Sequence, residues 1–394
     1  TEAFRNGDFR AVLGDPLPDL DPLGRTVYEG TIYDPTTTRT VGGQVVRDPF
    51  MGCDGQTLNV ICMSTADIDP VAANYERFWP TLTTNSLTNN YAVSWDSGTT
   101  QTNVAVKMDH NLSNKLKLTG YYANYKINVD YTDGLDAPLS AGRVFTEQTH
   151  TIRRGADYTI SPTMLFNVGA GLMHFVFKDP QPNINFDPLA ELGLPGTFVT
   201  VAPSLSLSST SRGGFRDTGP VAYASTWQIK PTGTASLAWV RGNHSMKFGF
   251  EMRAESHPVS VITPSNGKWI FDPVQTGMPY LGTAGSTGHP FASFLLGRFN
   301  KGEIGIPNRF HLGKHAIALY AQDSWKVTPT LTLDYGMRWD FQTYLQETYG
   351  RMPTWDPTAT NPDYGNLPGR TVYRKDIANN YPHAWGPRLG LAWQ

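Results

Sequence analysis

Residues 330–342, TLTLDYGMRWDFQ, alternate strictly between two kinds of side chain. The odd positions are apolar or aromatic, namely Leu331, Leu333, Tyr335, Met337, Trp339 and Phe341, and the even positions are Thr, Asp, Gly, Arg and Gln. Successive side chains of a β-strand point to opposite faces, so the stretch predicts a strand with one apolar face and one polar face. A helix would spread the same charges around its apolar stripe.

The same alternation recurs on both sides of this stretch. It is clearest at 103–109, 115–122, 151–160 and 244–255. Short connections with Asn, Ser, Gly or Pro join neighbouring runs, at 111–114, 161–163, 241–243 and 327–329, and this chemistry is typical of tight hairpins. We therefore predict hairpins near 103–126, 151–177, 232–255 and 314–343, within about nine strands in all.

Long segments rich in Pro, Gly, Ser, Thr and Asn separate the hairpins, at roughly 128–149, 178–231, 256–313 and 344–386. We expect them to be loops without regular structure. Short turns at one end of the strands and long loops at the other are the layout of outer-membrane barrels. In a compact soluble domain, four such loops would argue against the strand assignment.

These patterns predict an all-β fold, a partial, antiparallel transmembrane outer-membrane β-barrel with long extracellular loops. Residues 1–100 are expected to form a long extracellular loop region, and residues 101–394 the partial barrel. A soluble β-sandwich is the alternative, because its strands alternate equally well with the apolar face turned inward. Strand length and the asymmetry of the loops favour the membrane.

Composition excludes several other classes. The formal net charge of -2 gives no support to a nucleic-acid partner. Only 17% of the residues are charged, while 12% are aromatic and 38 are Gly, which suits strands joined by turns. No apolar run approaches the roughly 18 residues of a membrane helix, so a helical membrane protein is excluded.

In a barrel, the two faces of each strand meet different surroundings. The charged face suits a hydrated lumen and the apolar face suits outer-membrane lipid. Candidate lumen-lining residues are Lys247, Glu251, Arg253, Asp334, Arg338 and Asp340. Candidates for the aromatic girdles at the membrane surfaces are Trp325, Tyr335, Trp339 and Trp393.

The chain shows no motif for catalysis, for a cofactor or for a resident metal, so we expect no enzyme. His311 and His315 have the spacing of a metal pair on a helix, but they straddle a Gly and run into a predicted strand. The two cysteines, Cys53 and Cys62, lie nine positions apart in a Gly- and Asp-rich segment. Outside the cytoplasm they suggest a disulfide that closes a loop, and two unpaired thiols are the alternative.

Several motifs are similar to those of a known family. YAQDSWKVTP at 320–329, followed by LTLDYGMRW at 331–339, resembles a strand-turn-strand of the Oar-like branch of TonB-dependent outer-membrane transporters. GNHSMKFG at 242–249 and PRLGLAW at 387–393 agree with that resemblance. It implies a barrel in a Gram-negative bacterium that takes up a substrate, with energy delivered by the TonB complex.

Transporters of that family carry a TonB box and a plug domain before the barrel, and neither is recognisable in this sequence. The chain starts at Thr1 without a signal peptide and stops at Gln394 inside a strand-like run, so we expect it to be a piece of a longer protein. A passive porin, or a surface adhesin or β-rich secreted binding protein, are the alternative functions. Nothing in the sequence identifies the substrate.

The alternation makes a direct prediction about labelling. Single cysteines at positions 338 and 340 should react with a membrane-impermeant thiol reagent in the intact protein, and cysteines at 339 and 341 should be protected by lipid. A shift by one residue exchanges the two faces of a strand. Preferential labelling at 339 and 341 would therefore contradict the predicted register.

Overall fold

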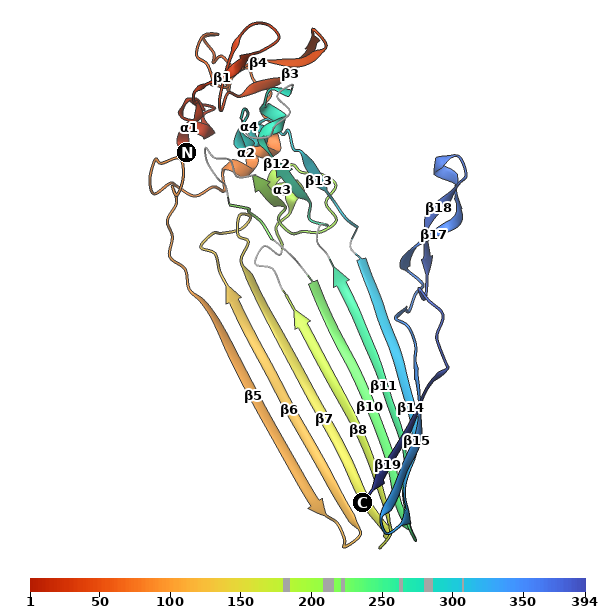
Figure 1. Ribbon diagram of the computed structural model, residues 1–394. Coiled ribbons are helices and arrows are strands. Elements are labelled where there is room, and N and C mark those ends of the chain that lie inside the picture. Colours follow the sequence, from red (N-terminus) through yellow and green to blue (C-terminus); the bar gives the residue numbers. More distant parts are fainter. Residues whose placement is uncertain (180–184, 208–215, 221–223, 262–264, 280–285, 307) are drawn as a thin grey trace.

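The computed structural model describes residues 1–179, 185–207, 216–220, 224–261, 265–279, 286–306 and 308–394. Its main feature is one large antiparallel sheet with long, tilted strands (Figure 1). In spatial order these are β19 (Ala384–Trp393), β15 (Leu331–Gln342), β14 (Asn308–Thr328), β11 (His244–Val261), β10 (Ala224–Arg241), β8 (Met164–Lys178), β7 (Arg143–Ser161), β6 (Leu116–Tyr131) and β5 (Ser97–Asn111). The short β16 (Gln346–Glu347) pairs with β14 beside this path.

Four tight turns lie together at one end of the sheet, at the bottom of Figure 1. They join β5 to β6, β7 to β8, β10 to β11 and β14 to β15, which are the predicted pairs. The third turn needs Gly242, whose φ of 58° lies in the left-handed region. We call this the turn end of the sheet, and the opposite end the loop end.

The strands are longer than the alternation indicated. The β6 and β7 strands pair from Leu116 and Tyr158 to Tyr131 and Arg143, and β11 and β14 pair up to Val261 and Asn308. Toward the loop end both faces become polar, as at 146–149. The alternation of apolar and polar residues is therefore lost from the sequence there, although backbone pairing continues. The predicted hairpin limits near 126, 151, 232 and 314 therefore fall inside the strands.

The cross-strand register places side chains of the same kind next to one another on neighbouring strands. One row runs across the sheet through Thr119, Gly155, Gly169, Thr234, Glu251, Ala318 and Asp340. The next row, on the opposite face, runs through Leu118, Ala156, Val168, Ala235, Phe250, Leu319 and Trp339. We call these two sides the polar face and the apolar face of the sheet.

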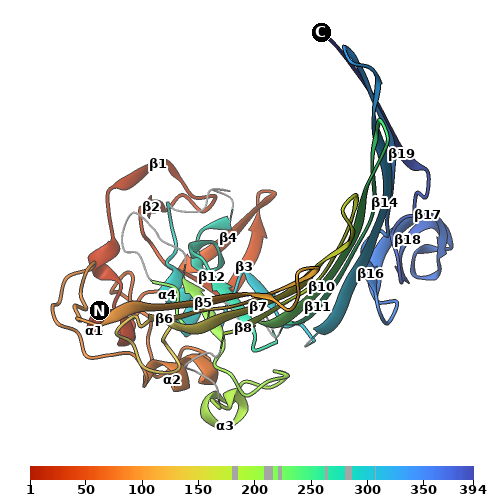
Figure 2. The ribbon, with the colours of Figure 1, turned by 90° about the horizontal axis from the view of Figure 1, so that it is seen from below.

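The sheet is curved but not closed (Figure 2). Its two edges are β5 and β19, which have no partner on their outer sides within the described residues. The edge strand β5 is exposed along its whole length. This is an open portion of a barrel wall rather than a complete cylinder. Within the same ranges, no helix is long and apolar enough to cross a membrane.

The long segments between the hairpins are not structureless, contrary to expectation. Together with residues 1–96, the segments that follow β6, β8 and β11 form a small folded unit at the loop end, which we call the cap (Figure 1). Its elements are α1 (Glu2–Arg5), η1 (Arg10–Val12), β1 (Pro16–Leu20), β2 (Thr26–Tyr28), β3 (Tyr33–Val41), β4 (Gln44–Pro49), α2 (Pro70–Glu76), α3 (Pro188–Leu192), β9 (Ser204–Leu207), β12 (Lys268–Phe271), η2 (Pro273–Thr276), α4 (Pro290–Leu295) and β13 (Lys301–Glu303). A separate hairpin, β17 (Met352–Asn361) and β18 (Leu367–Arg374) with η4 (Pro362–Tyr364) at its tip, stands apart.

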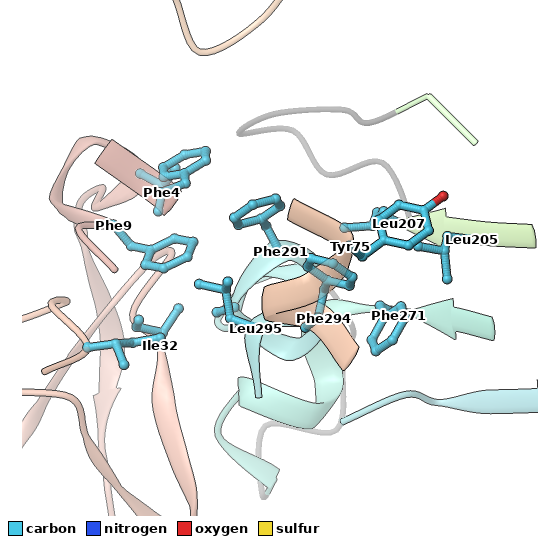
Figure 3. Packing of buried hydrophobic residues seen from close by; sticks show 14 of the residues in the cluster. Phe4, Phe9, Ile32, Tyr75, Leu205, Leu207, Phe271, Phe291, Phe294 and Leu295 are labelled. Carbon is cyan, nitrogen blue, oxygen red and sulfur yellow. The ribbon is translucent and has the colours of Figure 1, made fainter. Parts of the chain in front are cut away.

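Segments far apart in the sequence build the cap core. Buried side chains from residues 4–75 pack against side chains from the segments that follow β6, β8 and β11 (Figure 3). Phe294 shows this well, since its ring lies 6.2 Å from that of Tyr75 and 5.4 Å from that of Phe271. The strand β12 pairs in parallel with β9 and antiparallel with β13. The cap therefore folds as one unit although its segments leave the sheet at different strands.

Side-chain caps and a disulfide fix the local turns of the cap. Asp69 begins α2 by accepting bonds from the backbone N–H groups of Val71 and Ala72 at 2.9 and 3.0 Å, so its carboxylate is a helix cap. The sulfurs of Cys53 and Cys62 are bonded to each other. The loop closed by that bond contains Asp54, whose pKa is lowered to about 2, first by the Thr57 hydroxyl and then by backbone donors.

A mutation in the cap core should loosen distant segments together. Phe294→Ala is expected to cost about 3–5 kcal/mol of cap stability, because it leaves a cavity among three aromatic rings. Hydrogen exchange should then accelerate both in residues 4–76 and in residues 265–296, with the sheet strands unchanged. Leu189→Ala is the matched control, since that side chain is 60% exposed. Acceleration confined to α4 would show that the segments do not form one unit.

Candidate functional site

The six residues predicted to line a lumen come together on the polar face of β11 and β15. Register places Lys247 opposite Gln322, and Arg253 opposite Ala316. It also places Asp334 opposite Ser324, and Arg338 opposite Tyr320. Glu251 and Asp340 both stand opposite Ala318, so the two carboxylates share one row with a small residue between them.

Arg338 connects the two carboxylates of that row. Its Nη2 lies 2.9 Å from Oε2 of Glu251, and its Nε lies 3.0 Å from Oδ2 of Asp340. The guanidinium carbon also lies 5.8 Å from the centre of the Tyr320 ring. A planar guanidinium can satisfy two carboxylates and an aromatic face at once, which an ammonium group cannot. We call Glu251, Tyr320, Arg338 and Asp340 the arginine cluster.

Gly249 makes room for the ring that supports this cluster. A Cβ placed on Gly249 would lie 2.1 Å from Cζ of Tyr320, well inside van der Waals contact. The Tyr320 ring therefore lies flat over the backbone of β11 instead of standing away from the sheet. The sequence showed Gly249 only as a small residue on the polar side of its strand, and the neighbour that requires it becomes visible only with the register.

A polar depression of about 710 Å³ lies on the turn-end side of the arginine cluster. It is lined by Lys247, Gln322, Asp334, Arg338 and Arg388, among others. Charges of both signs thus face one hollow, and exposed pairs of this kind contribute little stability, about 0–1 kcal/mol each. They are better placed to meet a polar solute than to hold the fold together.

Other charges of the polar face are paired locally. On β5 and β6, near the opposite edge of the sheet, Asp109 lies 3.5 Å from Lys107 and 3.9 Å from Lys117. Nearer the loop end, Glu255 lies 3.4 Å from Arg253 and 3.8 Å from Lys314. The polar face is therefore a mosaic of positive and negative charges. It does not carry an excess of one sign that would attract anions alone or cations alone.

The two spaced histidines do not form a metal pair. Both His311 and His315 lie on β14. In an extended chain a spacing of four residues holds two side chains far apart, whereas on a helix it would bring them together. The Nε2 atom of His311 lies 2.6 Å from the Ser256 hydroxyl. Within the described ranges, no group of three His, Cys, Asp or Glu side chains has the arrangement of a metal site.

The predicted aromatic girdle residues lie on the apolar face. Trp325 and Tyr335 stand near the turn end, and Trp339 is stacked against Phe341 with ring centres 6.0 Å apart. Trp393 pairs with Leu331, one row from the β14–β15 turn. The sequence reasoning missed Asp323, a carboxylate on this same face that lies 2.6 Å from Nδ1 of His244.

Comparison with known proteins gives a family and a fold. The family described as "Outer membrane beta barrel domain" matches residues 1–394. No curated protein matches the chain. The outer membrane transporter YddB from Escherichia coli is similar in structure, with a TM-score of 0.40 and 11% identity over 67% of this chain and 31% of that one.

Two receptors are similar at a comparable level. The ferric yersiniabactin uptake receptor FyuA from Yersinia pestis gives a TM-score of 0.33 at 8% identity, over 74% of this chain and 34% of that one. The ferric-catecholate import receptor Fiu from E. coli K12, in its closed form, gives 0.33 at 11% identity, over 75% and 40%. This chain thus spans well under half the length of each of these proteins.

The contact between Gly249 and Tyr320 can be tested by a double-mutant cycle. Gly249→Ala should lower the free energy of unfolding by about 1–3 kcal/mol, because the new methyl group displaces the Tyr320 ring. In a Tyr320→Ala background the same change should cost little. Urea unfolding of protein folded in lipid vesicles measures both. Gly155→Ala is the control, since its nearest neighbour would lie 3.6 Å away, and equal costs in both backgrounds would contradict the contact.

Proposed function

Because this chain belongs to the outer membrane beta barrel domain family, we propose that it is part of a TonB-dependent transporter of the Oar-like type. It lies in the bacterial outer membrane, and its antiparallel sheet forms a portion of the barrel wall. The proposed activity is uptake of a solute, with energy delivered by the TonB complex of a Gram-negative cell. No catalytic step is part of the proposal.

The observation that carries the proposal is the combination of a two-faced wall with a folded cap at only one end. In such a barrel the turn end faces the periplasm and the loop end faces the outside of the cell. The cap, which includes residues 1–96 and the long segments after β6, β8 and β11, is then extracellular. A folded unit of that kind supports selective capture at the entrance better than it supports an open pore.

In this proposal the polar face lines the lumen and the apolar face meets lipid. The arginine cluster and the depression beside it then lie on the path of the solute. Their mixed charges support binding of a polar solute by hydrogen bonds at several points. Lys247, Arg253 and Asp334 would share that role with Glu251, Arg338 and Asp340. Energy coupling in this proposal belongs to the TonB box and the plug domain that the resemblance implies.

The motifs at 320–339 and 242–249 support the Oar-like assignment. They lie in β14, β15 and β11, the strands that carry the arginine cluster, and a short turn joins β14 to β15 inside the 320–339 motif. The substrate class stays open, because the mosaic of charges on the polar face favours neither an anion nor a cation.

Direct binding and conductance together test the proposal on the full-length protein. We expect the purified periplasmic domain of TonB to bind it, and we expect planar bilayers containing it to show no steady conductance. A passive porin would give the opposite pair of results, namely no TonB binding and a stable open conductance. An adhesin would bind no TonB and conduct no ions. Either of the last two outcomes contradicts the transporter.

A matched pair of variants separates the lumen from the lipid face once a transported solute is in hand. Arg338→Met should lower uptake several-fold, because it removes the centre of the arginine cluster. Met337→Leu, on the opposite face of the same strand, should leave uptake unchanged. Equal effects would show that the polar face does not line the path.

A further inference from the structure

A second hollow lies on the apolar face, at the turn end. Its volume is about 790 Å³. The lining residues are Trp239, Arg241, Gly242, Asn243, His244, Met246, Asp323, Trp325 and Tyr335. Register places Met246 between Trp239 and Asp323 in one row, and His244 between Arg241 and Trp325 in the next row of the same face. These are the last two rows of the apolar face before the β10–β11 turn.

The hollow contains a carboxylate where the strand pattern calls for an apolar residue. Along the apolar face of β14 the sequence runs Ile317, Leu319, Ala321, Asp323, Trp325 and Val327. A charge on the lipid side of a barrel strand is unfavourable unless it is paired or lies near the membrane surface. Asp323 lies two rows from the turn, at the depth where polar groups of lipid begin.

One oxygen of this carboxylate accepts two side-chain bonds, and the other accepts none from the residues that the structure describes. Oδ2 of Asp323 lies 2.6 Å from Nδ1 of His244 and accepts a 2.8 Å hydrogen bond from the Tyr335 hydroxyl. The side chain is only 9% exposed. Its Oδ1 is buried and has no hydrogen-bond partner among the described residues. A buried carboxylate oxygen without a donor is costly, so a donor from outside the protein would be favoured there.

A cation with no carboxylate partner lines the same hollow. The guanidinium carbon of Arg241 lies 5.5 Å from the centre of the Trp239 ring, so the side chain reaches back along its own strand toward the row of Asp323. Within the described part of the chain, no Asp or Glu forms an ion pair with Arg241. A guanidinium free of carboxylates at a membrane surface is suited to a phosphate group.

We propose that this hollow binds the headgroup of a phosphoethanolamine lipid. The ammonium group donates to Oδ1 of Asp323, and the phosphate accepts from Arg241. A zwitterion supplies both missing partners at once, whereas an anionic lipid supplies only the phosphate. At the turn end the sheet meets the periplasmic leaflet, where phospholipid headgroups lie at this depth.

The inference depends on the placement of the sheet in the outer membrane and not on transport. It also explains residues for which the solute path has no use. Asp323 and Trp325 belong to the 320–329 motif, and His244 belongs to the 242–249 motif. By register all three side chains lie on the apolar face, opposite the arginine cluster.

Native mass spectrometry of the purified full-length protein tests the site. Mixed micelles should contain equal amounts of a phosphatidylethanolamine and a phosphatidylglycerol with identical acyl chains. We expect the wild-type protein to retain the ethanolamine lipid about tenfold better, which is the worth of one hydrogen bond to a charged group. Asp323→Asn should abolish this preference, and Arg241→Gln should lower retention of both lipids.

Two further variants serve as controls for structure. Tyr335→Phe removes one bond to Oδ2 but keeps the carboxylate, so it should keep the preference for ethanolamine. Asp334→Asn, on the polar face, should also keep it. Equal retention of the two lipids by the wild type would overturn the proposal. So would an intact preference in Asp323→Asn, or an equal loss in Asp334→Asn.

Should Asp323→Asn fail to fold, the Arg241 variant decides. Unchanged retention of both lipids in Arg241→Gln would overturn the proposal, and a loss of both would support the phosphate contact. The preference of the wild type for the ethanolamine lipid is then the evidence for the ammonium contact.

Discussion

The backbone of every strand in this sheet is under one constraint. Lipid offers no water to its N–H and C=O groups, so these groups must bond to one another. The ladders from β5 to β19 satisfy those groups strand by strand in antiparallel register. Because the ladder fixes each residue against its neighbours, it also fixes which side chains share a face. The arginine cluster and the Asp323 hollow are both consequences of that register. They lie on opposite sides of β11, β14 and β15, and β10 also lines the hollow.

The cap depends on the ladder in a different way. The curved sheet brings the ends of β6, β8 and β11 close together at the loop end, so the segments that leave them can share one core with residues 4–75. Backbone bonds tie these segments together, as between Gly30 and Ser286 and between Asp69 and Leu295. This core holds the long segments in place, although the cap contributes no strand to the large sheet. It gives the loop end a defined surface, which the proposed selective uptake requires.

Much of the wall was predictable from sequence, and little of the cap. Period-two alternation located the strands and put Glu251, Arg338 and Asp340 on one face, because that pattern is local. It could not show that Arg338 connects the two carboxylates, or that Gly249 accommodates Tyr320, since both depend on how β11, β14 and β15 are aligned. The cap helices have only 4–7 residues, too short for a periodic signal, and they begin at side-chain caps such as Asp69.

The central claim is that this sheet is a portion of a membrane barrel with its polar face inside. A cryo-electron microscopy map of the full-length protein in lipid nanodiscs tests it most directly. We predict a further strand hydrogen-bonded along each of β5 and β19, the arginine cluster facing an enclosed interior, and the apolar face against lipid. A map in which either edge lies bare in lipid, or in which Trp339 points inward and Arg338 outward, would contradict the account.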